Sequence, residues 1–273
     1  MVEWVEELFE VTKPVIGVVH LKPLPGSPFF SGSLEEVYEA ALRDAKALYE
    51  GGVDGLIVEN FNDYPFLKSR VGPEVIATMS AIVRDIVKEV RLPVGVNVLR
   101  NDGIAAIAIA YATGASYVRI NAYTDVLVTE QGIVEPCAAE ALRYRKYLSC
   151  EVKVLADILC KHAYPLVPLR LEEAIFNAVI RGRADAIIIT GERTGIEPNL
   201  MEVKKAKEVT SGTPIFVGSG LRPDNVKEYL KYADGAIVGT WFKKGGDVSR
   251  EVDVKRVREF MDKVREVRKW GRH

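Results

Sequence analysis

The sequence has few cysteines, no long apolar run and almost no net charge, and each of these features excludes a class of protein. Its three cysteines are odd in number and lack the spacing of metal-binding pairs, so we expect reduced thiols rather than disulfides. Its apolar runs are far shorter than the roughly 20 residues of a membrane-spanning helix. No basic segment followed by an apolar stretch opens the chain, so no secretion signal is predicted and we expect a cytoplasmic protein.

The charges are balanced, which argues against nucleic acid or an anionic membrane as a partner. The chain carries 37 Lys and Arg residues against 38 Asp and Glu residues, a formal net charge of -1, so no long-range field attracts polyanions. The basic C-terminal segment, residues 254–273, places Val257, Met261 and Val264 at helical spacing and predicts a helix with a solvated charged face. Any anionic ligand must therefore be bound by a local site.

Short apolar runs rich in β-branched residues alternate with helical patterns along the chain. Eight runs have the composition of strands buried on both faces, and they read "KPVIGVVH", "GGVDGLIVE", "LPVGVNV", "TGASYVRIN", "EVKVLAD", "GRADAIIIT", "TPIFVGSG" and "KYADGAIVG". Ser33 and Glu36 predict a capping box for a helix that stops at Gly51 and Gly52, and Pro73 begins a second helix. Further helices are predicted to begin near Gly103, Cys137, Leu171, Leu200, Pro223 and Asp253.

Eight strands alternating with eight helices are typical of one fold. We predict an α/β protein, a closed (β/α)8 TIM barrel of the phosphate-binding type, formed by residues 1–273 as a single domain. An open doubly wound sheet is the alternative, but no G-x-G-x-x-G motif follows the first predicted strand. In a TIM barrel, functional residues lie at the C-terminal ends of the strands, so those ends are where we expect the site.

Three polar residues at or just after strand ends are predicted to be catalytic. His20 follows the first strand in "VVHLKPLPGSP", and Asp157 closes the fifth, which faces the first across an eight-stranded ring. Such a pair can act as general base and general acid on a bound substrate. Lys161 lies just beyond Asp157. If its side chain is desolvated, we expect a Schiff-base nucleophile; the alternative is a solvent-exposed side chain.

Other polar residues at the strand ends are predicted to bind substrate. They are Glu59, Asn60, Asn97, Arg119, Asn121, His162 and Thr190. Amides and carboxylates suit ligand hydroxyls, while Arg119 suits a carboxylate or second phosphate, or pairs with Glu59 inside the barrel. A metal site was the alternative for the His, Asp and Glu residues, but no HxH or HExxH spacing supports it, so we predict neither metal nor cofactor.

Two glycine-containing turns predict a phosphate site. "VGSG" follows the seventh strand and "VGTWFK" follows the eighth, the position at which phosphate-binding barrels hold the anion by backbone N–H groups and a helix N-terminus. The predicted phosphate-binding residues are Gly218, Ser219, Gly220, Gly239 and Thr240. Lys243 is a candidate counter-ion. The alternative is a pair of tight turns without a ligand.

Several motifs resemble one known family. "VIGVVHLKPLPGSP", "VENFNDYPF", "KHAYPL", "TGERTG", "GSGLRPDNV" and "DGAIVGTWFKKGG" are similar to the motifs of the BtpA family, and the resemblance covers nearly the whole chain. It implies a TIM barrel related to phosphoribosyl-binding isomerases. Some members of the family are linked to photosystem I biogenesis and others to sugar metabolism, so the resemblance does not by itself select a reaction.

Two functions are consistent with these observations. The first is an enzyme of the isomerase or lyase type that acts on a small phosphorylated metabolite, such as a sugar phosphate or a nucleotide-like compound. The second is a non-catalytic assembly or stability factor that works through partner proteins. We favour the enzyme because a scaffold has little need for His20 and Asp157 in a pocket. Whether the chain forms a homo-oligomer is left open.

Overall fold

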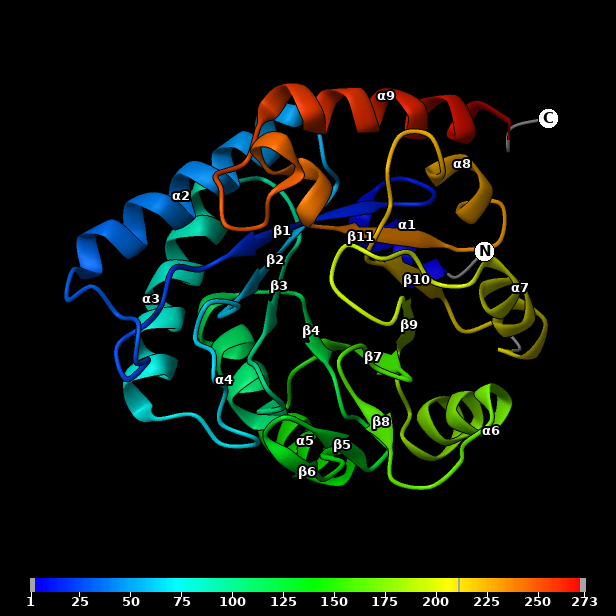
Figure 1. The fold of residues 1–273 in the computed structure, drawn as a ribbon, viewed down its shortest axis with the longest axis horizontal. Helices are drawn as coiled ribbons and strands as arrows, with labels where there is room; N and C mark the ends of the chain where they lie inside the picture. Colours follow the sequence, from blue (N-terminus) through cyan, green and yellow to red (C-terminus); the bar gives the residue numbers. More distant parts are fainter. Residues whose placement is uncertain (1–2, 211, 271–273) are drawn as a thin grey trace.

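Eight parallel strands close into a barrel (Figure 1) in the computed structural model, which describes residues 3–210 and 212–270. The barrel strands are β1 (Val15–His20), β2 (Gly55–Glu59), β3 (Val94–Asn97), β4 (Tyr117–Ile120), β7 (Lys153–Ile158), β9 (Ala186–Thr190), β10 (Ile215–Gly218) and β11 (Gly235–Val238). Each strand pairs with the next in chain order, and β11 closes the ring by pairing with β1. The prediction of a TIM barrel is confirmed.

Helices surround the barrel and alternate with its strands (Figure 1). They are α2 (Leu34–Gly51), α3 (Pro73–Glu89), α4 (Gly103–Thr113), α5 (Ala138–Tyr147), α6 (Leu171–Phe176) with a π-helical turn (Asn177–Arg181), α7 (Leu200–Val209), α8 (Val226–Tyr229) and α9 (Val254–Trp270). Every predicted helix is present, although α8 has only four residues. Residues 271–273 of the predicted C-terminal helix lie outside the described residues, as do residues 1–2 and 211 of the predicted domain.

The ends of α2 show how the sequence sets a helix boundary. The Ser33 hydroxyl accepts a hydrogen bond from the Glu36 backbone N–H at 3.2 Å, which satisfies one of the free donors of the first turn. At the other end, Gly52 has a φ of 89°, a left-handed conformation that glycine adopts without steric cost. The predicted start and stop of this helix are therefore confirmed.

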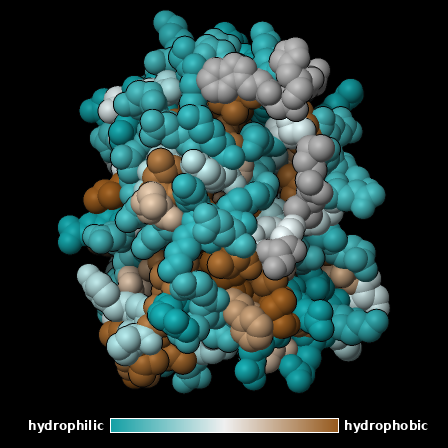
Figure 2. Space-filling view, turned by 90° about the vertical axis from the view of Figure 1, so that its right-hand side faces the viewer, coloured by the Kyte–Doolittle hydropathy of each residue, from teal (hydrophilic) through white to brown (hydrophobic). Residues whose placement is uncertain are grey.

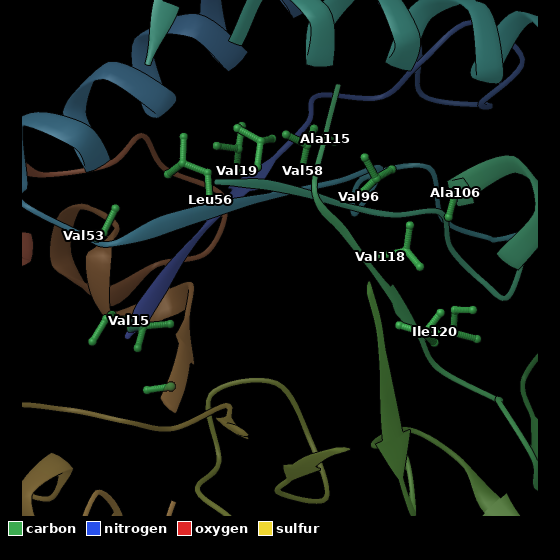
Figure 3. Close-up of a cluster of buried hydrophobic side chains, with 14 of the residues drawn as sticks. Val15, Val19, Val53, Leu56, Val58, Val96, Ala106, Ala115, Val118 and Ile120 are labelled. Carbon is green, nitrogen blue, oxygen red and sulfur yellow. The ribbon is translucent and has the colours of Figure 1, made fainter. Parts of the chain in front are cut away.

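Alternate residues of each strand face the helices and form the main core. Val19, Val58, Val96 and Val118 are essentially inaccessible to solvent and belong to one apolar cluster with the inner faces of the helices. Figure 3 shows these side chains along the strands of one side of the barrel. Because side chains alternate along a strand, the residues between them point into the barrel interior.

The N-terminal half of the barrel interior is apolar and closed from below by a short helix. Helix α1 (Glu3–Phe9) contributes Phe9, whose ring lies 5.7 Å from Tyr117 and 6.4 Å from Phe216. Ile57 from β2 and Leu155 from β7 belong to the same layer. The seven residues of α1 show no pattern from which this helix was predicted. Because α1 covers the N-terminal end of the barrel, we expect a ligand to reach the interior from the C-terminal end.

A small antiparallel sheet is inserted between barrel strands. It is formed by β5 (Leu127–Thr129), β6 (Gly132–Val134) and β8 (Tyr164–Pro165), in the order β6-β5-β8. Figure 1 places these strands beside α5, outside the barrel ring. This sheet was not predicted from the sequence. Its strands extend the wall of the C-terminal rim.

The surface carries one concentration of apolar side chains near α6. Leu166, Val167, Phe176 and Ile180 are each more than half exposed. Figure 2, which views the molecule from the side that carries α6 and α7, shows apolar residues gathered in the lower part of an otherwise largely hydrophilic face. Among the described residues, no helix combines the length and the apolar character needed to cross a bilayer.

Candidate functional site at the C-terminal rim

A layer of polar side chains lies above the apolar interior, at the C-terminal ends of the strands. His20 is two residues beyond the interior residue Val18, and Glu59 is two residues beyond Ile57. His20 is in register with Glu59, and Glu59 with Asn97, on neighbouring strands. Residues two apart on a strand point to the same side, so the inward-facing side chains change from apolar to polar from one such position to the next.

Arg119 is the centre of a buried ion-pair network. Its Nε and Nη2 donate to the two carboxylate oxygens of Asp157, both at 2.9 Å, and its Nη1 donates to Glu59 Oε1 at 3.0 Å. All three side chains are at most 5% exposed. Burial alone would lower the pKa of Arg119, but the charges of Asp157 and Glu59 raise it instead. Arg119 therefore stays cationic and holds both carboxylates in place.

Neighbouring side chains complete the hydrogen bonds of this network. Asn97 Nδ2 donates to Glu59 Oε1 at 3.1 Å, and Asn121 Nδ2 donates to Asp157 Oδ2 at 2.8 Å. The Cys160 thiol lies 3.4 Å from the same oxygen of Asp157. The predicted residues Asn97, Asn121 and Asp157 are thus brought together, and they fix the position of Glu59 and Arg119.

A cavity of about 290 Å³ opens above this network. Glu59 and Arg119 lie in its lining together with His20, Lys161 and the turns that follow β10 and β11. Asp157 is not among the lining residues, because it lies beneath Arg119 with a side chain that is fully buried. The five predicted phosphate-binding residues all line the cavity: Gly218, Ser219, Gly220, Gly239 and Thr240.

His20 lies at the cavity with a neutral imidazole. Burial lowers its pKa well below 6.5, and the nearby cations Lys243, Lys161 and Arg119 lower it further. Its Nδ1 is buried and has no hydrogen-bond partner within residues 3–210 and 212–270. The ring packs 4.5 Å from that of Phe61. The lowered pKa favours the neutral form of the imidazole, which makes His20 a weak base.

Lys161 approaches the turn after β10. Its Nζ lies 3.4 Å from Ser219 Oγ. Burial lowers the pKa of Lys161, and Arg119 lowers it further, while Glu59 and Asp157 raise it. Lys161 is partly buried, so it lies between the desolvated and the exposed outcomes that the sequence left open. A lysine with a lowered pKa is a better nucleophile or proton donor than an exposed one.

The two turns at the phosphate-binding position bring the backbone close to the cavity. Ser219 and Gly220 have φ values of 71° and 63°. A Cβ on Gly220 would lie 2.1 Å from the Glu197 backbone nitrogen, and a Cβ on Gly239 would lie 2.8 Å from His20 Cε1. Glycine therefore lets the turn after β10 pack against the Glu197 backbone, and lets the turn after β11 pack against the His20 imidazole.

Two cationic residues of the cavity were missed by the sequence analysis. Arg222 follows the turn after β10, and Arg256 lies on α9, where the sequence predicted a solvated face. The Arg256 guanidinium lies 3.9 Å from the centre of the Trp241 ring, and its Nε donates to the Trp241 carbonyl at 2.6 Å. No pattern in the sequence indicates which positions of α9 reach the rim.

Two residues singled out by the sequence, Asn60 and Lys243, lie away from both the cavity and the ion-pair network. The side chain of Asn60 bonds to Asp63 and to the Leu99 backbone, because Asn60 follows the inward-facing Glu59 by one residue and so faces outward. The prediction of Lys243 as a counter-ion for the phosphate is wrong. Its side chain is 1% exposed, and its Nζ lies 2.6 Å from Asp44 Oδ2.

His162 and Thr190 line a neighbouring cavity instead. His162 Nε2 lies 3.0 Å from Thr194 Oγ1 and 3.1 Å from the Thr194 backbone N–H, so it positions the loop after β9. No three His, Cys, Asp or Glu side chains converge as metal ligands within the part of the chain that the structure describes.

The fold and the site define a class: a closed (β/α)8 barrel with a polar cavity at the C-terminal ends of its strands. The family model for the BtpA family matches residues 11–266, and the chain belongs to this family.

Relatives support this assignment, and solved structures share the fold. The photosystem I biogenesis protein BtpA of Synechocystis is 46% identical, with 95% of this chain and 91% of the relative aligned. An uncharacterized protein of Pyrococcus furiosus is 48% identical, with 90% of this chain and 92% of the relative aligned. Among solved structures, N-(5'-phosphoribosyl)anthranilate isomerase from Pyrococcus furiosus has a TM-score of 0.57 at 16% identity and covers 93% of this chain and 99% of its own. KGPDC from Streptococcus mutans has a TM-score of 0.60 at 13% identity, with 94% and 99% covered. At 16% and 13% identity, the two solved structures establish the fold of this chain and nothing further.

Proposed function

We propose that the chain is an enzyme of the isomerase or lyase type that binds a small phosphorylated metabolite in the cavity at the C-terminal rim. One observation carries the proposal: two glycine-containing turns and four cationic side chains line one cavity of about 290 Å³ that also holds a neutral histidine. The name of the isomerase from Pyrococcus furiosus, which specifies a phosphoribosyl substrate, supports a phosphorylated ligand in a barrel of the same fold.

The phosphate would lie between the turns after β10 and β11. Ser219, Gly220 and Thr240 offer backbone that approaches the cavity closely, and Arg222 and Arg256 add positive charge beside them. Arg256 is already oriented by its contacts with Trp241, so little side-chain freedom is lost when it binds an anion. Charge-assisted hydrogen bonds of this kind are the strongest that a phosphate makes with a protein.

His20 and Lys161 would perform the chemistry. The neutral imidazole would take a proton from the carbon next to a carbonyl, and the protonated amine of Lys161 would give a proton to the carbonyl oxygen, which leaves an enol. Asp157, which the sequence suggested as the general acid, would have a positioning role instead. Its oxygens already accept hydrogen bonds from Arg119 and Asn121, so it would position Arg119 against the ligand.

Binding is tested by isothermal titration calorimetry with inorganic phosphate and ribose 5-phosphate. Arg256→Gln should weaken ribose 5-phosphate about tenfold, because a charge-assisted contact is lost. Lys255→Gln, which removes the same charge from an exposed neighbour on α9, should leave the affinity unchanged. Absence of binding by either probe, or equal effects of the two substitutions, would contradict the phosphate site.

Catalysis is tested separately by ³¹P NMR of a panel of sugar phosphates incubated with the protein. His20→Gln should abolish turnover and keep phosphate affinity within about threefold, since the phosphate contacts are made by other residues. Turnover that survives His20→Gln at the wild-type rate would refute the assigned role.

A second candidate function is a non-catalytic assembly factor. The name of the Synechocystis relative, a photosystem I biogenesis protein, favours it, as does the exposed apolar surface at Phe176 and Ile180. Complementation separates the two: an enzyme loses cellular function with His20→Gln, whereas an assembly factor loses it with Phe176→Ser and Ile180→Ser.

A further inference from the structure

A second and larger cavity, of about 920 Å³, adjoins the first. Its walls come from the inserted strand β5, the segment after β7 and the loop after β9. Lys161 lines both cavities, and the loop after β9 separates them: Thr194 and Gly195 line the first cavity, while Arg193 and Ile196 on either side line the second.

We propose that the second cavity binds the non-phosphorylated half of the substrate, and that this half is an uncharged or cationic group rich in hydroxyl or amino substituents, such as a sugar or an amino sugar. The inference rests on the proposed function, because the phosphate must occupy the first cavity for the rest of the molecule to extend into the second.

The first cavity is lined by an excess of positive charges and the second by an excess of negative charges. Four cationic side chains and one carboxylate line the first cavity. The second is lined by four carboxylates, Glu130, Glu192, Glu197 and Glu202, but only two cations, Lys161 and Arg193. The ion pair between Arg222 and Glu197, at 3.4 Å, cancels one charge in each cavity. The first cavity stays net positive and the second net negative. A second anionic group would therefore be repelled from the larger cavity.

A buried hydroxyl in the second cavity lacks a partner. Thr190 closes β9, lines this cavity and is 7% exposed. Its Oγ1 has no hydrogen-bond partner among the residues that the structure describes. Buried hydroxyls are normally hydrogen-bonded, so one without a partner at a cavity wall is explained by a ligand group that supplies it. A ligand hydroxyl or amine can both donate to and accept from it.

The distance between the two sites is short enough for one small molecule. Lys161 Nζ, at the boundary, lies 3.4 Å from Ser219 Oγ in the turn that would hold the phosphate. A hexose 6-phosphate extends several ångströms beyond its phosphate and would pass Lys161. The contact of His162 with Thr194 fixes the loop that forms the dividing wall, so both sites exist before the ligand binds.

The test compares three ligands that share a phosphate and a six-carbon chain: glucosamine 6-phosphate, glucose 6-phosphate and 6-phosphogluconate. Calorimetry with the full chain should show that the first two bind at least about fivefold more tightly than 6-phosphogluconate, whose carboxylate would face the acidic cavity. Inorganic phosphate serves as the probe of the first cavity alone.

Two variants assign the effect to the second cavity. Glu130→Gln with Glu192→Gln should reduce the discrimination against 6-phosphogluconate to about twofold, because two nearby negative charges are removed. The matched control, Glu208→Gln with Glu228→Gln, removes two exposed charges that line neither cavity and should leave the discrimination intact.

Thr190→Val should weaken both hexose phosphates about fivefold without changing the affinity for inorganic phosphate, which also shows that the variant is folded. Equal affinities for the three esters, tighter binding of 6-phosphogluconate, or binding of inorganic phosphate without any ester overturns the inference and leaves the phosphate site intact. Failure of inorganic phosphate and of all three esters overturns the proposed function as well.

Discussion

Replacing Arg119 by Met tests the buried ion-pair network on which the site is built. The substitution removes three hydrogen bonds of 2.9 to 3.0 Å and leaves Glu59 and Asp157, which are 4% and 3% exposed, without their counter-ion. Breaking a buried ion pair by removing one partner costs about 3–5 kcal/mol, because the remaining charge stays desolvated. We therefore expect the free energy of unfolding to fall by about 3–5 kcal/mol near neutral pH.

The loss should depend on pH, and the sign follows from proton binding. In the variant, a buried carboxylate without a cation takes up a proton more easily in the folded state than in the unfolded state. The folded state then binds more protons, so the variant regains stability as the pH falls from about 8 toward about 5. A substitution that only created a packing defect would not show this recovery.

Urea unfolding followed by tryptophan fluorescence at the two pH values measures the effect. Adding Glu59→Gln and Asp157→Asn to Arg119→Met removes the unpaired charges and should recover at least about half of the loss at high pH. Arg91→Met, which alters an exposed arginine, should stay within about 0.5 kcal/mol of the wild type. A loss below about 1 kcal/mol for Arg119→Met, or an equal loss at both pH values, would refute the reasoning.

Three further predictions concern other residues. Gly239→Ala places a Cβ 2.8 Å from His20 Cε1 and should lower the affinity for ribose 5-phosphate measured by calorimetry, because the imidazole and the turn must separate. Lys243→Met leaves Asp44 buried without its partner and should lower the free energy of unfolding in urea by about 3 kcal/mol; a loss of phosphate affinity in the folded variant would instead restore Lys243 as a counter-ion. Burial raises the pKa of the Cys160 thiol to about 12, so a thiol reagent at about pH 8 should label Cys160 only after unfolding, and mass spectrometry that finds it labelled in the folded protein would contradict this.

The fold was predictable because each barrel strand is a continuous apolar run. Strands such as β2 (Gly55–Glu59) and β9 (Ala186–Thr190) are buried on both faces, so their sequences are apolar at every position until the strand ends. Elements without such a run were missed. Strands β5 and β6 have three residues each and β8 has two, which is too short for periodicity to identify them.

The site was predictable to the level of strand ends and no finer. The same continuous run that identifies a strand hides which of its residues face inward, so Glu59 and Asn60 both qualified although only Glu59 faces the cavity. Contacts between residues far apart in the sequence could not be predicted either. Lys243 pairs with Asp44, almost 200 residues earlier, and Arg256 reaches the cavity from a helix whose pattern indicates only a buried and an exposed side.

The positive charge of the first cavity explains why His20 and Lys161 would take different roles. Burial lowers the pKa of both, and cations around His20 lower its pKa further. A dianionic phosphate beside Ser219 would favour the protonated form of Lys161, which lies 3.4 Å from that residue. For His20 the same phosphate competes with burial, which is the largest effect on its pKa. The bound ligand would therefore keep Lys161 protonated, as the proton donor to the carbonyl oxygen, and leave His20 as the neutral base.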